Sequence, residues 1–150
     1  MNKLVLFFLS TVLSASALAV GNERVVKTAT FPETKGMIVA AEGDLEPRSI
    51  GSYSLRLYAK NDPAYPYDQF VTGTVRPRNG TIESIKFADL NHDGKAEIIV
   101  TIRYVGSGAY VTVDAFRFHK QSLQLLTSIA GMDAKADAIQ ALKKKLQKKH

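Results

Sequence analysis

The stretch "IIVTIRYVGSGAYVTVDAFRF", residues 98–118, decides the fold class of this 150-residue chain. Two runs rich in β-branched and aromatic residues, Ile98–Val105 and Tyr110–Phe118, flank the connection Gly106-Ser107-Gly108-Ala109. Such residues favour strands, and glycines reach the positive φ that a sharp reversal of the chain needs. The stretch therefore predicts a β-hairpin. Alternation places four residues on one face of its first strand: Ile98, Val100, Ile102 and Tyr104.

The segments around this hairpin have the same character. Short runs with strand composition are separated by turn residues such as Asn61–Pro66 and Pro77–Gly80. The further predicted strands are Arg24–Phe31, Lys35–Ala41, Ser52–Tyr58, Phe70–Val75, Ile82–Phe87 and Leu123–Ile129. About eight short strands at this spacing are typical of an antiparallel β-sandwich or flattened barrel. We therefore expect an all-β fold.

The last segment changes its period. Apolar residues recur there at helical spacing: Met132, Ala136, Ile139, Leu142 and Leu146. Asp133 is placed to cap a helix, and lysines follow at the end where the helix dipole favours them. The pattern predicts a C-terminal helix after the strands.

The first residues have the layout of a secretory signal peptide. Lys3 precedes the apolar run Leu4–Leu13, and the small-residue sequence Ala17-Leu18-Ala19 follows. We expect cleavage after Ala19, with cleavage after Ala17 as the alternative, and a single domain, residues 20–150, exported to the periplasm. The apolar run is too short for a transmembrane span, so no transmembrane segment is expected.

Composition excludes several classes of protein. The chain contains no cysteine, which excludes thiol chemistry and cysteine-ligated metals. Its net charge of +6 comes mainly from the lysines between 143 and 149, and a solvated helix face is the favoured interpretation of that cluster. Basic and aromatic residues do not interleave as they do in nucleic-acid-binding proteins, so no nucleic-acid partner is expected.

Ser107 does not have the setting of a catalytic nucleophile. The hydrolase elbow needs glycines two positions before and after the serine, and Val105 and Ala109 stand there instead. We therefore expect no catalytic residue. The spacing leaves two alternatives for the loop. Either it protrudes, with Ser107 at its tip and Tyr110 as an interface anchor, or it is a tight hairpin with Tyr110 packed on a neighbouring strand.

The segment "DLNHDGKAE", residues 89–97, is rich in oxygen ligands. The candidate calcium ligands are Asp89, Asn91, Asp93 and Glu97. An EF-hand is excluded because its twelfth position would be Val100. The favoured alternative is a metal-free turn in which the aspartates accept hydrogen bonds from backbone amides and Gly94 takes positive φ.

Three segments resemble one family. The run Ser107-Gly108-Ala109-Tyr110 resembles the loop signature of bacterial inhibitors of animal lysozymes. "AEGDLEPRSIGSYSLRLY" (residues 41–58) and "FADLNHDGKAEIIV" (residues 87–100) resemble the periplasmic inhibitors of invertebrate-type (I-type) lysozyme in particular. The lysine-rich C-terminal helix has no counterpart in this resemblance.

The resemblance implies a non-enzymatic β-sandwich that inserts its loop into the lysozyme cleft and occludes the catalytic carboxylates. The residues implied are Ser107 and Tyr110, with Gly106 and Gly108 shaping the loop. It also implies a homodimer and no cofactor. The alternatives are an inhibitor of goose-type lysozyme, a calcium-assisted glycan-binding β-sandwich and, least favoured, a small exported hydrolase using Ser107.

Overall fold

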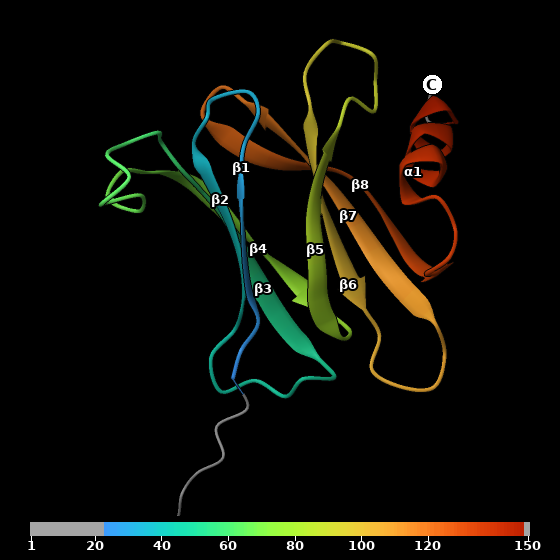
Figure 1. Cartoon of the computed structure of the whole chain (residues 1–150). Helices are drawn as coiled ribbons and strands as arrows, with labels where there is room; N and C mark the ends of the chain where they lie inside the picture. Colours follow the sequence, from blue (N-terminus) through green and yellow to red (C-terminus); the bar gives the residue numbers. More distant parts are fainter. Residues whose placement is uncertain (1–22, 149–150) are drawn as a thin grey trace, which may run out of the picture.

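The computed structural model of the protein describes residues 23–148. Its strands form two antiparallel sheets of four strands each (Figure 1). The first sheet contains β1 (Val26–Thr30), β2 (Met37–Glu42), β3 (Gly51–Tyr58) and β4 (Phe70–Arg78), in that order. The second contains β5 (Thr81–Ala88), β6 (Glu97–Arg103), β7 (Tyr110–His119) and β8 (Ser122–Asp133). The predicted all-β sandwich is confirmed. The predicted signal peptide, residues 1–19, lies outside the described residues.

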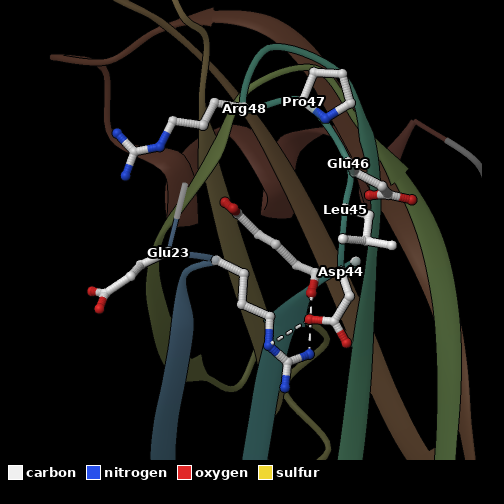
Figure 2. A pocket seen from close by; sticks show the side chains of 9 residues that line it. Glu23, Asp44, Leu45, Glu46, Pro47 and Arg48 are labelled. Atoms are coloured by element: carbon white, nitrogen blue, oxygen red, sulfur yellow. Dashed lines mark hydrogen bonds and ion pairs between the residues drawn. The ribbon is translucent and has the colours of Figure 1, made fainter. Parts of the chain in front are cut away.

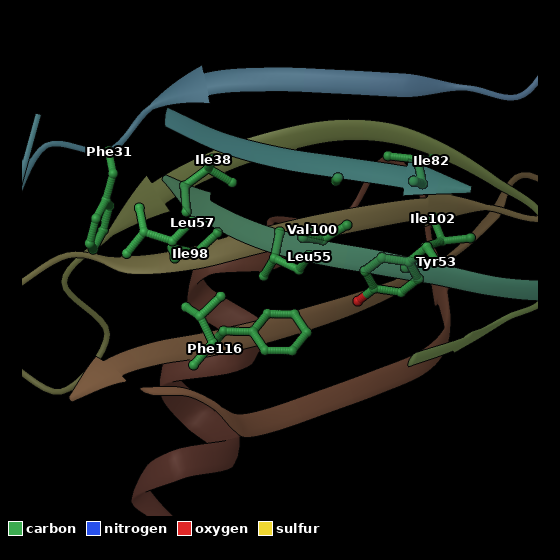
Figure 3. Packing of buried hydrophobic residues seen from close by; sticks show 12 residues of the cluster. Phe31, Ile38, Tyr53, Leu55, Leu57, Ile82, Ile98, Val100, Ile102 and Phe116 are labelled. Carbon is green, nitrogen blue, oxygen red and sulfur yellow. The ribbon is translucent and has the colours of Figure 1, made fainter. Parts of the chain in front are cut away.

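The core lies between the two sheets, and strand alternation fills it (Figure 3). On β3, Tyr53, Leu55 and Leu57 are buried, while the residues between them are not. From the second sheet, β6 and β7 contribute Ile98, Val100, Ile102 and Phe116. Each fully buried apolar side chain of this size stabilises the fold by roughly 1.5–3 kcal/mol. Packing therefore holds the two sheets together in a chain without cysteine.

The edges of the two sheets lie close to each other. β4 packs beside β8, and β1 packs beside β5, so the sandwich has the character of a flattened barrel. The turn at Asn79-Gly80 carries the chain from the first sheet directly into the second. The sequence predicted a longer turn beginning at Pro77, but Pro77 pairs with Ser52 as part of β4.

The helix α1 (Ala138–Gln147) covers the outer face of the second sheet (Figure 1). Leu142 is fully buried there, together with Ile99 of β6. Both faces of β6 are therefore buried, although alternation alone predicted one buried face. Tyr104, predicted to continue that face, follows the end of the strand. No helix among residues 23–148 is long and apolar enough to cross a membrane.

The predicted start of the helix is wrong. Asp133 and Met132 belong to β8, where they pair with Tyr110 and Val111. The helix is capped instead by Asp137, whose side chain accepts a hydrogen bond from the Gln140 backbone N–H at 3.1 Å. Pairing with β7 extends β8 to Asp133, so Met132, the first residue of the predicted helical pattern, lies in the strand. From there its side chain packs into the apolar cluster under the helix.

Candidate functional site

The connection between β6 and β7 spans residues 104–109 and projects from one end of the sandwich (Figure 1). All residues from Val105 to Tyr110 are exposed, and Ser107 lies in the middle of the connection. Two backbone hydrogen bonds close its base. Tyr104 N–H donates to the Tyr110 carbonyl at 3.0 Å, and Ala134 N–H donates to the Ala109 carbonyl at 2.7 Å. The connection is longer than the four residues that the sequence predicted.

Tyr110 packs against the backbone of its own loop. A Cβ atom added to Gly108 would lie 2.7 Å from Cδ2 and 2.8 Å from Cε2 of the Tyr110 ring. Gly108 therefore provides the space in which the ring rests, and the ring is still 51% exposed. Gly106 has open space around it but a φ of +142°, which favours glycine. The two glycines thus serve the loop in different ways.

Two further contacts fix the strands below the loop. The Thr112 hydroxyl donates to the Tyr104 hydroxyl oxygen at 3.2 Å. Arg103, the last residue of β6, forms an ion pair with Glu83 on β5. The hydrogen bond to Glu83 and its negative charge raise the pKa of the Arg103 guanidinium. The base of the loop is therefore held by side chains from neighbouring strands.

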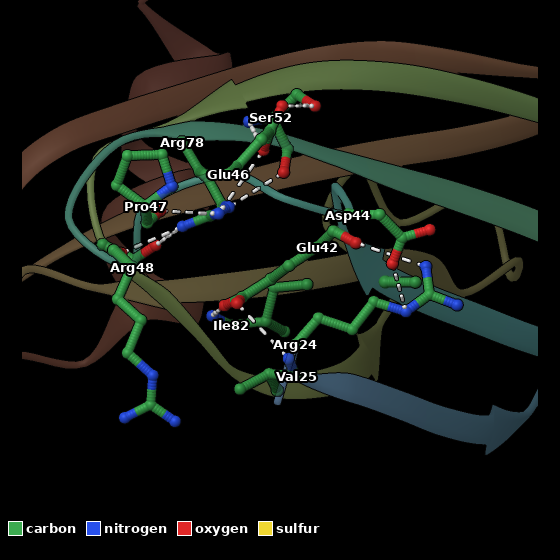
Figure 4. A network of polar contacts seen from close by, with 12 residues as sticks. Arg24, Val25, Glu42, Asp44, Glu46, Pro47, Arg48, Ser52, Arg78 and Ile82 are labelled. Carbon is green, nitrogen blue, oxygen red and sulfur yellow. Dashed lines mark hydrogen bonds and ion pairs between the residues drawn. The ribbon is translucent and has the colours of Figure 1, made fainter. Parts of the chain in front are cut away.

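A buried arginine organises the adjacent connections at the same end (Figure 4). The Arg78 side chain donates to the backbone carbonyls of Ser52 (2.8 Å), Arg48 (2.9 Å), Pro47 (3.0 Å) and Gly80 (2.7 Å). It also donates to Glu46 Oε2 at 3.4 Å. One guanidinium thus ties the β2–β3 connection, residues 43–50, to the β4–β5 turn.

Gly80 extends this unit to the β6–β7 connection. A Cβ atom on Gly80 would lie 1.9 Å from the Arg103 carbonyl oxygen and 2.9 Å from Cα of Tyr104, so the two backbones touch there. The three connections at this end are therefore in continuous contact through Arg78 and Gly80.

Glu46 is the acidic centre of the β2–β3 connection. Its carboxylate accepts from Ser52 N–H at 2.6 Å and from the Ser52 hydroxyl at 2.8 Å. These two hydrogen bonds, with the Arg78 charge, outweigh desolvation and hold the pKa of Glu46 below its usual value. Cβ atoms on Gly43 and Gly51 would both collide with the carboxylate group. The sequence signal for this cluster is a glutamate spaced between two glycines, one in the connection and one at the start of β3.

Beside this loop lies a hollow of about 560 Å³ (Figure 2). Its lining residues are Glu23, Arg24, Glu42, Gly43, Asp44, Leu45, Glu46, Pro47 and Arg48. An ion pair of 3.1 Å between Arg24 and Asp44 crosses it. Leu45 is fully exposed, with a φ of +63°. This end of the molecule therefore combines an exposed loop, an apolar side chain and fixed charges.

The oxygen-rich loop at residues 89–97 is hydrogen-bonded within itself. Asp89 accepts from the N–H groups of Asp93 (3.2 Å) and Gly94 (2.9 Å), and Asp93 accepts from Lys95 N–H at 2.8 Å. Gly94 has a φ of +81°. Burial raises the pKa of Asp89, but the backbone N–H groups outweigh it and the pKa lies below its usual value. The metal-free turn accounts for each of these contacts.

Glu97 does not join the other calcium candidates as a free ligand. It is buried, and its Oε2 accepts from Leu90 N–H at 2.8 Å. Burial, with the charges of Asp93 and Asp89, raises its pKa. Within residues 23–148, no group of three or more His, Cys, Asp or Glu side chains is arranged to hold a metal ion.

Comparisons with known proteins give a consistent result. Residues 23–146 match the family described as periplasmic lysozyme inhibitor of I-type lysozyme. The crystal structure of such an inhibitor from Aeromonas hydrophila is similar, with 40% identity and a TM-score of 0.70 over 79% of this chain and 98% of that one. The same inhibitor in complex with Meretrix lusoria lysozyme gives 40% identity and a TM-score of 0.71, covering 79% and 95%. No curated protein matches the chain.

Proposed function

Because the chain belongs to the family of periplasmic inhibitors of I-type lysozyme, we propose that it blocks its target by inserting the β6–β7 connection into the active-site cleft. The role of this family is inhibition, a binding function and not a catalytic one, and its compartment is the periplasm. We further propose that residues 1–19 are the signal peptide and that residues 20–150 form the single inhibitory domain.

The exposure of Ser107 and Tyr110 on one projecting loop carries the proposal. A lysozyme cleft presents two carboxylates that flank the scissile glycosidic bond. The Ser107 hydroxyl is free to donate to one of them, and a hydrogen bond to an ionised group is stronger than one between neutral groups. The half-exposed ring of Tyr110 supplies apolar area and a polar tip, which suits a residue at an interface.

The anchoring of the loop supports tight binding. Three contacts restrict the loop before any partner is present. They are the backbone hydrogen bond between Tyr104 and Tyr110, the hydrogen bond from Ala134 N–H, and the packing of the Tyr110 ring on Gly108. A loop already ordered in the free protein loses little conformational entropy when it docks. Gly106 and Gly108 therefore contribute to inhibition by shaping the loop.

We also propose that two copies pair through the outer face of the first sheet. The helix covers the second sheet, whereas no helix among the described residues covers the first. In the register of β3 and β4, Leu55 of the core pairs with Thr74, so Val75 points outward and is 68% exposed. Phe70, the first residue of β4, is 60% exposed. Light scattering should show a dimer that Val75→Glu converts to monomer; a monomeric wild type would contradict the pairing.

The test of the inhibitory function is a lysis assay against three classes of enzyme. Purified protein is added to invertebrate-, goose- and chicken-type lysozymes acting on the same bacterial cell-wall substrate. We expect inhibition of the I-type enzyme at concentrations that leave the other two active. Stronger inhibition of the goose-type enzyme would support that alternative target, and inhibition of none would overturn the function.

A further inference from the structure

The lysines of α1 have no part in the proposed inhibition. Residues 138–148 carry four lysines, Lys143, Lys144, Lys145 and Lys148, and no acidic side chain. The opposite side of the helix, with Leu142 and Leu146, packs on the second sheet. None of the ion pairs within residues 23–148 involves these lysines. The helix therefore presents concentrated positive charge to its surroundings.

Part of this charge lines a groove. An open groove of about 690 Å³ separates α1 from the β5–β6 connection, residues 89–96, which is the oxygen-rich loop described above. Its lining residues are His92, Gln140, Ala141, Lys143, Lys144 and Gln147. All of its polar side chains can donate hydrogen bonds, and none is acidic. The acids of the β5–β6 connection, Asp89 and Asp93, accept hydrogen bonds from backbone N–H groups of the following residues, Asp93 and Gly94 for Asp89 and Lys95 for Asp93. The groove thus suits an anion with several oxygen atoms.

The groove and the inhibitory loop lie at opposite ends of the same strand. β6 runs from Glu97, which follows the β5–β6 connection, to Arg103, which precedes the β6–β7 connection. Figure 1 shows these two connections projecting in opposite directions, with the C-terminal end of α1 beside the first of them. A ligand in the groove would therefore leave Ser107 and Tyr110 accessible.

We propose that this groove and the lysine face of α1 bind the phosphate groups of an anionic lipid surface. Lys148 extends the positive charge beyond the groove, which favours a surface that presents many phosphates over a single enclosed ion. Lys145 is also exposed, but its Nζ donates to the Ser128 carbonyl at 2.5 Å and adds to the positive charge from there. The family is periplasmic, and phospholipid leaflets bound that compartment. The apolar residues of α1 are turned toward the sheet, so the contact is electrostatic and needs no insertion into the bilayer.

Vesicle binding of the full mature protein tests the proposal. Co-sedimentation is measured with vesicles of phosphatidylcholine alone and with vesicles that also contain phosphatidylglycerol, each at low and high salt. We expect binding only to the second kind, and its loss at high salt because screening weakens contacts between exposed charges. Lys143→Gln with Lys144→Gln should weaken binding roughly 25-fold, about fivefold for each lysine. The matched control, Lys27→Gln with Lys60→Gln, removes the same charge elsewhere and should change binding less than twofold.

Equal loss in both double variants would overturn the proposal, since it would mean that only net charge matters. Binding to neither kind of vesicle would also overturn it. Displacement of the protein from vesicles by inorganic phosphate, at an ionic strength matched with chloride, would assign the groove to free phosphate instead. The melting temperature of each variant checks folding, and lysozyme inhibition by Lys143→Gln with Lys144→Gln should equal that of the wild type. That last measurement separates the lipid proposal from the inhibitory function.

Discussion

The Tyr53 hydroxyl on β3 donates a hydrogen bond of 2.6 Å to Asp114 Oδ2 on β7, joining the two sheets across the core. Both side chains are buried, and Arg76 approaches the same carboxylate oxygen at 3.6 Å. Burial and the negative charge of Asp114 raise the pKa of Tyr53. This polar link lies among the apolar side chains of the core between the two sheets, so its members depend on each other.

Replacing Tyr53 by phenylalanine should destabilise the fold. The ring and its packing remain, but Asp114 loses its hydrogen-bond donor while still buried. We expect the free energy of unfolding to fall by about 1.5–3 kcal/mol, the contribution of a hydrogen bond to a charged group. Urea denaturation measures it. Tyr67→Phe, at an exposed loop tyrosine, is the matched control and should change the same quantity by less than about 0.5 kcal/mol. Equal effects would contradict the role of the link.

The Tyr53–Asp114 hydrogen bond also determines how the free energy of unfolding changes with pH. Because the pKa of Tyr53 is raised, the stability that this group contributes is present below the unfolded pKa of about 10. It is lost as pH rises through the folded pKa. The stability difference between wild type and Tyr53→Phe should therefore shrink only in strongly alkaline solution.

Substituting Arg78 by lysine should destabilise the inhibitory end despite the retained charge. A lysine ammonium cannot reproduce a planar fork that reaches four carbonyls and Glu46. The expected loss is about 3 kcal/mol, together with faster proteolysis within residues 43–50. Arg56→Lys, at an exposed position of β3, controls for the exchange itself and should be close to neutral. Unchanged stability in Arg78→Lys would show that the network is not needed.

Glu97→Gln should be at least as stable as the wild type at neutral pH. Burial raises the pKa of Glu97, so in the wild type the free energy of unfolding decreases as pH rises from the unfolded pKa of about 4.3 through the folded value. The glutamine keeps an oxygen to accept from Leu90 N–H and carries no charge. Urea denaturation should show an advantage of Glu97→Gln at pH 7 that disappears near pH 4. A loss of stability at pH 7 would contradict the buried-charge account.

Gly108→Ala should weaken inhibition through Tyr110. The new methyl group would lie 2.7 Å from the ring and displace it, so we expect a roughly tenfold higher inhibition constant with an unchanged melting temperature. In a Tyr110→Ala background the same substitution meets no ring and should add little. If the two effects are instead independent and multiply, the contact between Gly108 and Tyr110 does not shape the binding surface.

Ser107→Ala should weaken inhibition without affecting the fold. Loss of one hydrogen bond to a charged partner corresponds to about 1.5–3 kcal/mol, or a roughly 10- to 100-fold higher inhibition constant. Ser122→Ala, at the first residue of β8, removes a hydroxyl at the end of the hairpin far from the loop and should leave inhibition unchanged. Inhibition constants from the lysis assay, with melting temperatures alongside, make the comparison.

The sequence predicted the parts of the fold that local patterns govern. Alternation located β3 and the β6–β7 hairpin, and the residue pattern of 89–97 indicated a turn held by aspartates. The end of β8 could not be found in this way, since Asp133 and Asp137 both suit a helix cap and only pairing with β7 decides between them. The burial of Ile99 likewise depends on α1, which begins only at Ala138.

The site was only partly predictable for a similar reason. Ser107 and Tyr110 lie on a loop whose composition marks it, so the sequence could single them out. The supporting role of Arg78 depends on backbone carbonyls as distant in sequence as Arg48 and Ser52, and backbone acceptors leave no compositional signal. Leu45 is similarly exposed because of the path of the β2–β3 connection, and the hydrogen bonds of Arg78 fix that path.

A crystal structure of this protein bound to an I-type lysozyme tests the central claim most directly. The account predicts that the β6–β7 connection occupies the active-site cleft, with Ser107 Oγ about 2.5–3.0 Å from a catalytic carboxylate oxygen and the Tyr110 ring buried at the interface. A complex in which residues 104–109 remain exposed to solvent while another face covers the enzyme would contradict it.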